Sequence, residues 1–316
     1  MRRIGIIEIN EQAEKIPNCI RFDKGSSKFP LPEEVVPHFH KAIENMRDKY
    51  CHYPNTGGEP KLKQLIAEIE KKNNRQVSAE NITITHGGTS GLFTALSCLT
   101  RPGDEIITSQ YCFELLSLLT SHFGLTQIRT DFSQIDEVKK AITQKTKLII
   151  FNSPENPTGK VYSQKKINDL AELVEYKKIW LLSDEVMHGV VYNNTFWYGP
   201  STDNERVVTI NSFSKTWFMP GGRIGWITSK DKRLAELFGN SLSMQTEGVS
   251  LFSQFMMAEA LKSIGYEGLL AKRMIILNDY SFGTKRYCPK TFGATKDSLS
   301  LLGARRNEFL CQLRTG

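Results

Sequence analysis

A lysine in the segment SFSKTWFMPGGRIGW is the residue best suited to covalent chemistry. Lys215 stands among Ser, Phe, Trp and Met side chains, and Arg223 follows it eight residues later. A lysine with apolar neighbours loses part of its charge, and its neutral amine can then form a Schiff base with an aldehyde. Ser212 and Lys215 also match the S-x-x-K pattern of serine acyl-enzymes. We do not favour acyl transfer, because no suitably placed K-T-G box and no S-D-N motif follows.

Three other segments place polar groups at the ends of predicted strands. The segment HGGTS, from His86 to Ser90, joins a strand to a helix. Its backbone N–H groups and hydroxyls suit an anion, although a Gly-Gly turn can also serve only as a tight link. The spacing matches neither the dinucleotide fingerprint nor the P-loop. Asn156 lies in a loop that two prolines stiffen.

Asp184 follows a run of apolar residues that ends in Ser183. A carboxylate at the end of a buried strand is costly unless a cation or a hydrogen-bond donor meets it. The alternative is an Asp that only caps the next helix. Together, an anion loop, an Asn, a buried Asp, and a Lys with an Arg at +8 form the set that pyridoxal phosphate requires.

With these motifs in family order, the chain resembles the fold-type I, class I/II pyridoxal-phosphate aminotransferases over roughly residues 20 to 270. The resemblance implies that Lys215 forms the Schiff base and carries the proton between substrate carbons. Asp184 would pair with the pyridinium nitrogen, and Asn156 would donate to the ring oxygen. The cofactor phosphate would be held by small, hydroxyl and basic residues, namely Gly88, Thr89, Ser212 and Arg223.

Two aromatic residues complete the set that the resemblance implies. Phe113, in YCFELL, matches the aromatic that stacks on the cofactor ring, although a core Phe on the following helix explains it equally well. Tyr53, in HYPNTGG, matches the tyrosine that reaches the phosphate of a neighbouring subunit. The resemblance therefore also implies a homodimer.

The chain departs from the family pattern at two places near the site. Met187 stands where the family has a tyrosine, and His188 follows it. Either this change moves the chemistry away from plain transamination, or a packing Met lies beside a surface His. The segment from Gly25 to Lys28 replaces a Gly-Glu-Pro-Asp loop near the substrate carboxylate. This segment therefore does not indicate which substrate the site selects.

The last residues depart further. Family members carry an arginine there that binds the substrate α-carboxylate as a bidentate pair. Arg305 and Arg306 lack the surroundings expected for that role, and the hydrophobic periodicity weakens from about Ser281. Our hypothesis is a C-terminal truncation, with an altered reading frame near residue 280. Reading the gene in its other frames would test it.

Strands and helices that alternate must position these residues. Hydrophobic runs predict strands at 81–85, 105–108, 147–151, 179–183, 207–211 and 223–228, and helical patterns cover 61–72, 89–99 and 164–176. We therefore predict an α/β fold, with a mainly parallel seven-stranded-type sheet, helices on both faces and a small, incomplete α+β domain. Residues 1–45 form an arm and part of the small domain, 46–270 the cofactor-binding large domain, and 271–316 the start of the C-terminal small domain.

Composition and charge exclude several other classes. The 316 residues carry a formal net charge of +7. The last 46 residues hold nine Lys and Arg against three Asp and Glu, so the body is close to neutral and we expect no nucleic-acid partner. No apolar run reaches the roughly 20 residues that span a bilayer, so we expect no membrane partner. The six scattered cysteines and the unprocessed start predict a cytoplasmic protein with reduced thiols and no metal site.

The sequence thus predicts a homodimeric pyridoxal-phosphate enzyme that moves an amino group between an amino acid and a 2-oxo acid through Lys215. Two alternatives stay open. One is a pyridoxal-phosphate lyase, oxidase or cyclase acting on an amino acid, which Met187 and the loop from Gly25 to Lys28 motivate. The other is a truncated remnant that binds cofactor without turnover.

Overall fold

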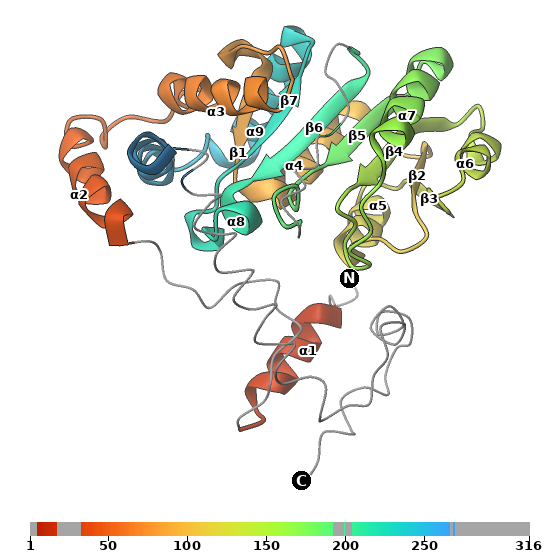
Figure 1. The fold of residues 1–316 in the computed structure, drawn as a ribbon, viewed down its shortest axis with the longest axis horizontal. Coiled ribbons are helices and arrows are strands. Elements are labelled where there is room, and N and C mark those ends of the chain that lie inside the picture. Colours follow the sequence, from red (N-terminus) through yellow and green to blue (C-terminus); the bar gives the residue numbers. More distant parts are fainter. Residues whose placement is uncertain (1–4, 18–32, 192–198, 200–203, 266–267, 269–316) are drawn as a thin grey trace.

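The computed structural model describes residues 5–17, 33–191, 199, 204–265 and 268 (Figure 1). The loop from Gly25 to Lys28, both C-terminal arginines (Arg305 and Arg306) and the predicted domain over 271–316 lie outside the described residues. The division into three domains therefore stays a prediction.

One mixed sheet organises the described part of the chain. Its seven strands are ordered β1-β7-β6-β5-β4-β2-β3, and all neighbours are parallel except β7, which runs antiparallel to β1 and β6. The strands are β1 (Ile82–Thr85), β2 (Glu105–Ser109), β3 (Thr126–Thr130), β4 (Thr146–Asn152), β5 (Trp180–Asp184), β6 (Val207–Ser212) and β7 (Gly225–Ser229). The predicted mainly parallel α/β sheet is confirmed.

Helices cover both faces of this sheet. The α-helices are α1 (Gly5–Glu14), α2 (Val36–Asn45), α3 (Pro60–Lys72), α4 (Gly87–Leu99), α5 (Glu114–His122), α6 (Ile135–Ala141), α7 (Gln164–Lys177), α8 (Phe213–Thr216) and α9 (Lys232–Thr246). Three 3-10 turns are η1 (Glu33–Val35), η2 (Ala79–Asn81) and η3 (Pro220–Gly222), and residues 251–265 are also helical. The three helices predicted from periodicity are all present, each within two residues of its predicted ends.

Alternation along β4 shows how the core is divided. Leu148 and Ile150 face a cluster that includes residues of α4, α5 and α9, while Ile149 and Phe151 face another cluster with α6 and α7. Successive side chains of a strand point to opposite faces, so a strand buried on both faces reads as the continuous apolar run seen in the sequence. A third cluster packs α3 against β1 and β7.

The sequence missed one strand and misplaced the start of another. β3 was not among the six predicted strands, because it lies at the sheet edge and its residues TQIRT are largely polar and only partly buried. The last strand begins at Gly225 and not at Arg223, because Arg223 has a φ of 49° and stands in the left-handed region just before it. No helix in the described ranges is long and apolar enough to cross a membrane.

Candidate active site

The sheet topology brings the predicted site residues to one edge. The carboxyl ends of β1, β4, β5 and β6 meet there, and the antiparallel β7 begins there, at the lower edge of the sheet where α8 lies in Figure 1. Asn152 pairs with Asp184 across β4 and β5, and Ser212 pairs with Gly225 across β6 and β7. Ligands of open α/β sheets bind at this edge, as the sequence predicts.

Asp184 ends β5 as a buried carboxylate, with 8% of its surface exposed. Its Oδ1 accepts a hydrogen bond from the backbone N–H of Val186 at 3.2 Å. Burial raises the pKa of Asp184 to about 6, and the Val186 bond opposes this only partly. No charged group of the described chain contributes to that pKa, so Asp184 is an acceptor suited to a protonated ring nitrogen.

Lys215 lies on α8, a single turn that begins immediately after β6. Ser212 caps this turn, because its Oγ accepts the backbone N–H of Ser214 at 3.2 Å. The side chain of Lys215 is half-buried. Burial, and secondly the positive charge of Arg223, lower the pKa of the Lys215 ammonium, which favours the neutral and nucleophilic amine.

Arg223 lies against the start of α4. Its Nη2 donates to the carbonyl of His86 at 3.3 Å, and its Nη1 donates to the carbonyl of Pro220 at 2.9 Å. A Cβ on Gly87 would lie 2.5 Å from Nη2, and one on Gly88 would lie 2.7 Å from the Val186 side chain. The two glycines therefore admit a guanidinium beside a helix N-terminus, an arrangement suited to a phosphate.

Asn156 stands in the loop after β4, and Asn152 anchors it. The Oδ1 of Asn152 accepts the backbone N–H of Asn156 at 2.6 Å, while its Nδ2 donates to the carbonyl of Asp184 at 2.9 Å. The sequence alone does not single out Asn152. The motif FNSPENPTG contains it, but its role depends on the register that sets it opposite Asp184.

His188 is buried, with 4% of its surface exposed, so the alternative of a surface histidine beside Met187 is wrong. Its ring packs against Trp217, and its Nδ1 lies 3.1 Å from both the carbonyl of Glu185 and the Nδ2 of Asn211. Asn211 in turn accepts the backbone N–H of Ser212 at 2.8 Å. The segment after Asp184 is thus bonded to the segment that carries Lys215. The sequence alone does not predict this link, because His188 lies in the turn after β5 and Asn211 lies in β6.

A buried ion cluster supports the same strand end. Arg75 donates to Glu70 at 2.7 Å and to both oxygens of Glu185 at 2.5 and 2.6 Å, and Trp226 donates to Glu70 at 2.8 Å. Burial raises the pKa of Glu185 to about 7, although Arg75 opposes the change. Although burial lowers the pKa of Arg75, its two carboxylate partners raise it above the ordinary value. The cluster ties α3 and β7 to the residue after Asp184.

The remaining predicted site residues lie at or near the same edge. Thr89 is exposed in the first turn of α4, and Phe113 is half-buried immediately before α5. Tyr53 lies in the turn before α3 and is 82% exposed, so it is available to a second molecule. The stacking of Phe113 on a cofactor ring stays a prediction.

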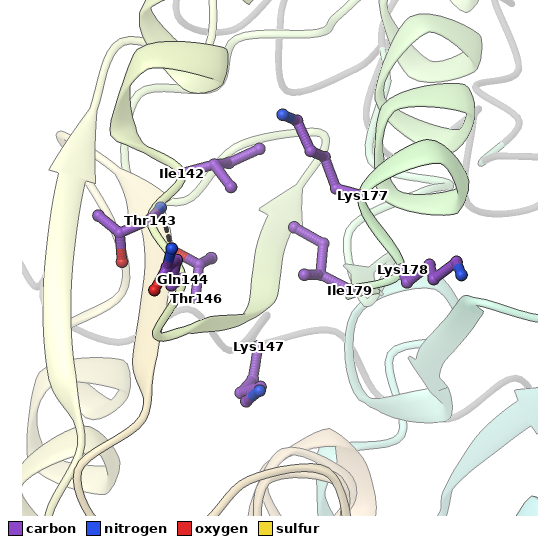
Figure 2. A pocket seen from close by; sticks show the side chains of 8 residues that line it. All are labelled: Ile142, Thr143, Gln144, Thr146, Lys147, Lys177, Lys178 and Ile179. Carbon is purple, nitrogen blue, oxygen red and sulfur yellow. Dashed lines mark hydrogen bonds between the residues drawn. The ribbon is translucent and has the colours of Figure 1, made fainter.

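A cavity of about 430 Å³ lies elsewhere, at the amino-terminal ends of β4 and β5. It is lined by residues before and within β4 and at the junction of α7 and β5. Figure 2 shows that the side chains of Lys147, Lys177 and Lys178 point in different directions around it. Because its cations do not converge and it is remote from Asp184 and Lys215, we do not treat it as the active site.

Comparison with known protein families identifies the class of protein to which this fold and this site belong. Residues 17–266 match the family model described as aminotransferase class I and II. The chain belongs to this family, as its sequence indicates, and the family uses pyridoxal 5'-phosphate. The described residues fit that cofactor, because a buried carboxylate without a cation, a lysine of lowered pKa and a glycine cradle beside Arg223 share one edge.

Individual relatives are mostly named as aspartate aminotransferases. A probable aspartate aminotransferase of Methanocaldococcus jannaschii is 33% identical over 232 residues, which are 70% of this chain and 59% of the relative. An aspartate aminotransferase of Thermotoga maritima is 28% identical over 83% of this chain and 74% of its own length. The solved aspartate aminotransferase of Thermus thermophilus with maleate has a TM-score of 0.78 and 25% identity, over 86% of this chain and 72% of that one.

Proposed function

We propose that the protein transfers an amino group between an amino acid and a 2-oxo acid, with pyridoxal 5'-phosphate held at the carboxyl edge of the sheet. The family membership supports the reaction class, and the chain spans 59% of the M. jannaschii relative. The observation that carries the proposal is that two groups lie at the carboxyl ends of neighbouring strands. One is Asp184, a buried carboxylate to which the described residues offer no cation, and the other is Lys215, a lysine of lowered pKa.

The bound cofactor supplies an aldehyde and an electron-accepting ring. Lys215 is the amine that would bind the aldehyde. Once the substrate amine has replaced it there, the freed Nζ would take a proton from the substrate Cα and deliver it to the cofactor carbon. Its lowered pKa supports both roles, because a neutral amine is the nucleophile and the base. Asp184 accepts a hydrogen bond from the protonated ring nitrogen and stabilises that proton by its negative charge.

The other predicted site residues are proposed to bind and orient the cofactor. Arg223, the α4 N-terminus with Gly88 and Thr89, and the hydroxyl of Ser212 are proposed to hold the phosphate. Asn156 donates to the ring oxygen, and Phe113 covers one face of the ring. Tyr53 is proposed to reach the phosphate of a second copy, since its exposure in the single chain leaves it available. We therefore propose a homodimer. The cytoplasmic location stays a prediction from the sequence.

The visible spectrum of the purified protein tests this function. We expect the absorbance of a lysine-bound pyridoxal group in the wild type and its loss in Lys215→Ala, because the amine is removed. Lys147→Ala, which removes an exposed lysine from β4 at the opposite edge, is the control and keeps the band. A wild type that takes up no cofactor overturns the proposal.

Product analysis then separates transamination from the other reactions. With an amino-acid panel and pyruvate, we expect new alanine without free ammonia. Ammonia without alanine would indicate lyase or oxidase chemistry. A bound cofactor whose spectrum no amino acid changes would indicate binding without turnover.

A further inference from the structure

Asn152 makes two hydrogen bonds that meet at the proposed ring site. It is the last residue of β4 and pairs with Asp184, the last residue of β5. Its Nδ2 donates to the Asp184 carbonyl at 2.9 Å, and its Oδ1 accepts the Asn156 backbone N–H at 2.6 Å. One neutral side chain therefore connects the backbones of Asp184 and Asn156.

The position explains why a side chain is needed there. The ladder between β4 and β5 ends at this pair, and the next backbone donor, the N–H of Ser153, reaches the Asp184 carbonyl only at 3.4 Å. The loop then turns away, held by a bond from the N–H of Glu155 to the carbonyl of Lys160 at 2.8 Å. Asn152 thus continues the ladder by one bond and fixes where the loop leaves the strand.

The amide group suits both partners at once. An Asn side chain offers an acceptor and a donor, whereas a carboxylate only accepts and a hydroxyl on Cβ is too short to replace both atoms. A neutral group also adds no charge next to Asp184, which burial already disfavours in its ionised form.

We propose that Asn152 is a positioning residue that fixes Asp184 and Asn156 relative to one another, so that both meet the same cofactor ring. The inference rests on the proposed function. Asp184 belongs to β5 and Asn156 to the loop after β4, and the bonds of Asn152 connect them. Asn152 acts through these two residues and does not itself touch the ring.

The test measures cofactor affinity in the full-length protein stripped of pyridoxal 5'-phosphate. In Asn152→Ala we expect the Kd for added pyridoxal 5'-phosphate to rise about five- to tenfold, the value of one or two positioned hydrogen bonds. The pH midpoint of the bound cofactor's visible absorbance should rise too. A bond donated to the ring oxygen stabilises the deprotonated form, and a displaced Asn156 donates it less well.

A double-mutant cycle separates positioning from general destabilisation. If Asn152 acts through Asn156, Asn152→Ala changes the Kd and the pH midpoint much less in the Asn156→Ala background than in the wild type. Equal changes in both backgrounds overturn the proposal. Asn168→Ala, an exposed asparagine on α7, is the matched control, and its Kd and midpoint stay at wild-type values.

Two further results keep the test decisive. Should Asn152→Ala not fold, Asn152→Asp replaces it, because the carboxylate still accepts the Asn156 N–H but cannot donate to the Asp184 carbonyl, so we expect a raised Kd. An unchanged Kd in that variant overturns the proposal. If the wild type binds no cofactor, the proposed function itself is overturned. If the wild type binds cofactor and Asn152→Ala has the same Kd and pH midpoint, only the role of Asn152 is overturned.

Discussion

At the scale of single residues, the buried carboxylate of Asp184 lowers the stability of the folded protein near neutral pH, a cost that its proposed bond to the cofactor would offset. Burial raises its pKa from the ordinary 3.8 to about 6. Between these values the folded protein binds more protons than the unfolded chain, so this group's stabilising contribution is lost as the pH rises from about 4 to about 6. Removing the charge while keeping the shape should recover that free energy at neutral pH.

The first prediction is that Asp184→Asn stabilises the cofactor-free protein by about 1–3 kcal/mol at pH 8, from a shift of about two units at 1.36 kcal/mol each. Near pH 4 the two proteins should be equally stable, because the wild-type carboxyl is then protonated. Urea unfolding at both pH values measures this. The same variant should bind pyridoxal 5'-phosphate more weakly, because a neutral amide does not hold the ring proton.

A matched control is Asp136→Asn, which removes a carboxylate that is 77% exposed on α6. It should change the free energy of unfolding little at either pH, because its charge lies in water. If Asp184→Asn is less stable than the wild type at pH 8, the carboxylate of Asp184 is not the uncompensated charge inferred from its surroundings.

At the scale of elements, the approach of Arg223 to α4 depends on Gly87. Gly87 has a φ of +74°, and a Cβ on it would lie 2.5 Å from Nη2 of Arg223. Gly103 has a φ of +91° with nothing within 4 Å of such a Cβ. The two glycines share the backbone strain that alanine would bring, but only Gly87 adds a clash with a proposed phosphate ligand.

The second prediction follows from this pair. Gly87→Ala and Gly103→Ala should each lose about 1–2 kcal/mol of stability through the left-handed backbone. Only Gly87→Ala should also weaken cofactor binding, by about tenfold or more, because its methyl displaces a charged hydrogen-bond donor. Thermal unfolding and cofactor titration measure the two effects. Equal cofactor affinities in both variants would show that Arg223 does not bind the phosphate.

The buried cluster of Glu70, Arg75 and Glu185 joins three elements, so its loss should be costly. The third prediction is that Arg75→Met destabilises the protein by about 3–5 kcal/mol at pH 8, because it leaves two buried carboxylates without a cation. The cost should shrink toward pH 5 as Glu185, whose pKa burial raises to about 7, takes up a proton. Urea unfolding at the two pH values checks the sign, with the exposed Arg233→Met as the control. A cost that grows at low pH would contradict the argument.

The parts that the sequence predicts are those encoded by local pattern. Strands β4 and β5 contain apolar runs because both faces of the sheet are covered, and Lys215 and Asp184 stand in short motifs. The parts that it misses depend on contacts between distant segments. Arg75 and Glu185 are 110 positions apart, and Asn152 gains its role only from the strand register.

At the scale of the whole molecule, the exposed position of Tyr53 bears on whether one active site is formed by one chain or by two. It is 82% exposed in the single chain, so it is available to contact a cofactor phosphate held by a second copy, as proposed. In a two-fold dimer each site would then combine Lys215 of one chain with Tyr53 of the other. The fourth prediction is that mixing two impaired variants, one in each residue, restores activity because the two chains share their sites.

Lys215→Ala and Tyr53→Ala should each be impaired alone, the first through loss of its amine and the second through a weakened phosphate contact. The two variants are mixed in equal amounts, dissociated and re-associated. Random pairing makes half of the dimers mixed, and each mixed dimer has one intact site, so about a quarter of all sites are intact. Transaminase activity at limiting cofactor should therefore return to about a quarter of the wild-type value. If Tyr53 served its own chain, every mixed site would carry at least one substitution and no activity would return. A light-scattering mass near 35.9 kDa, that of one chain, would contradict the dimer directly.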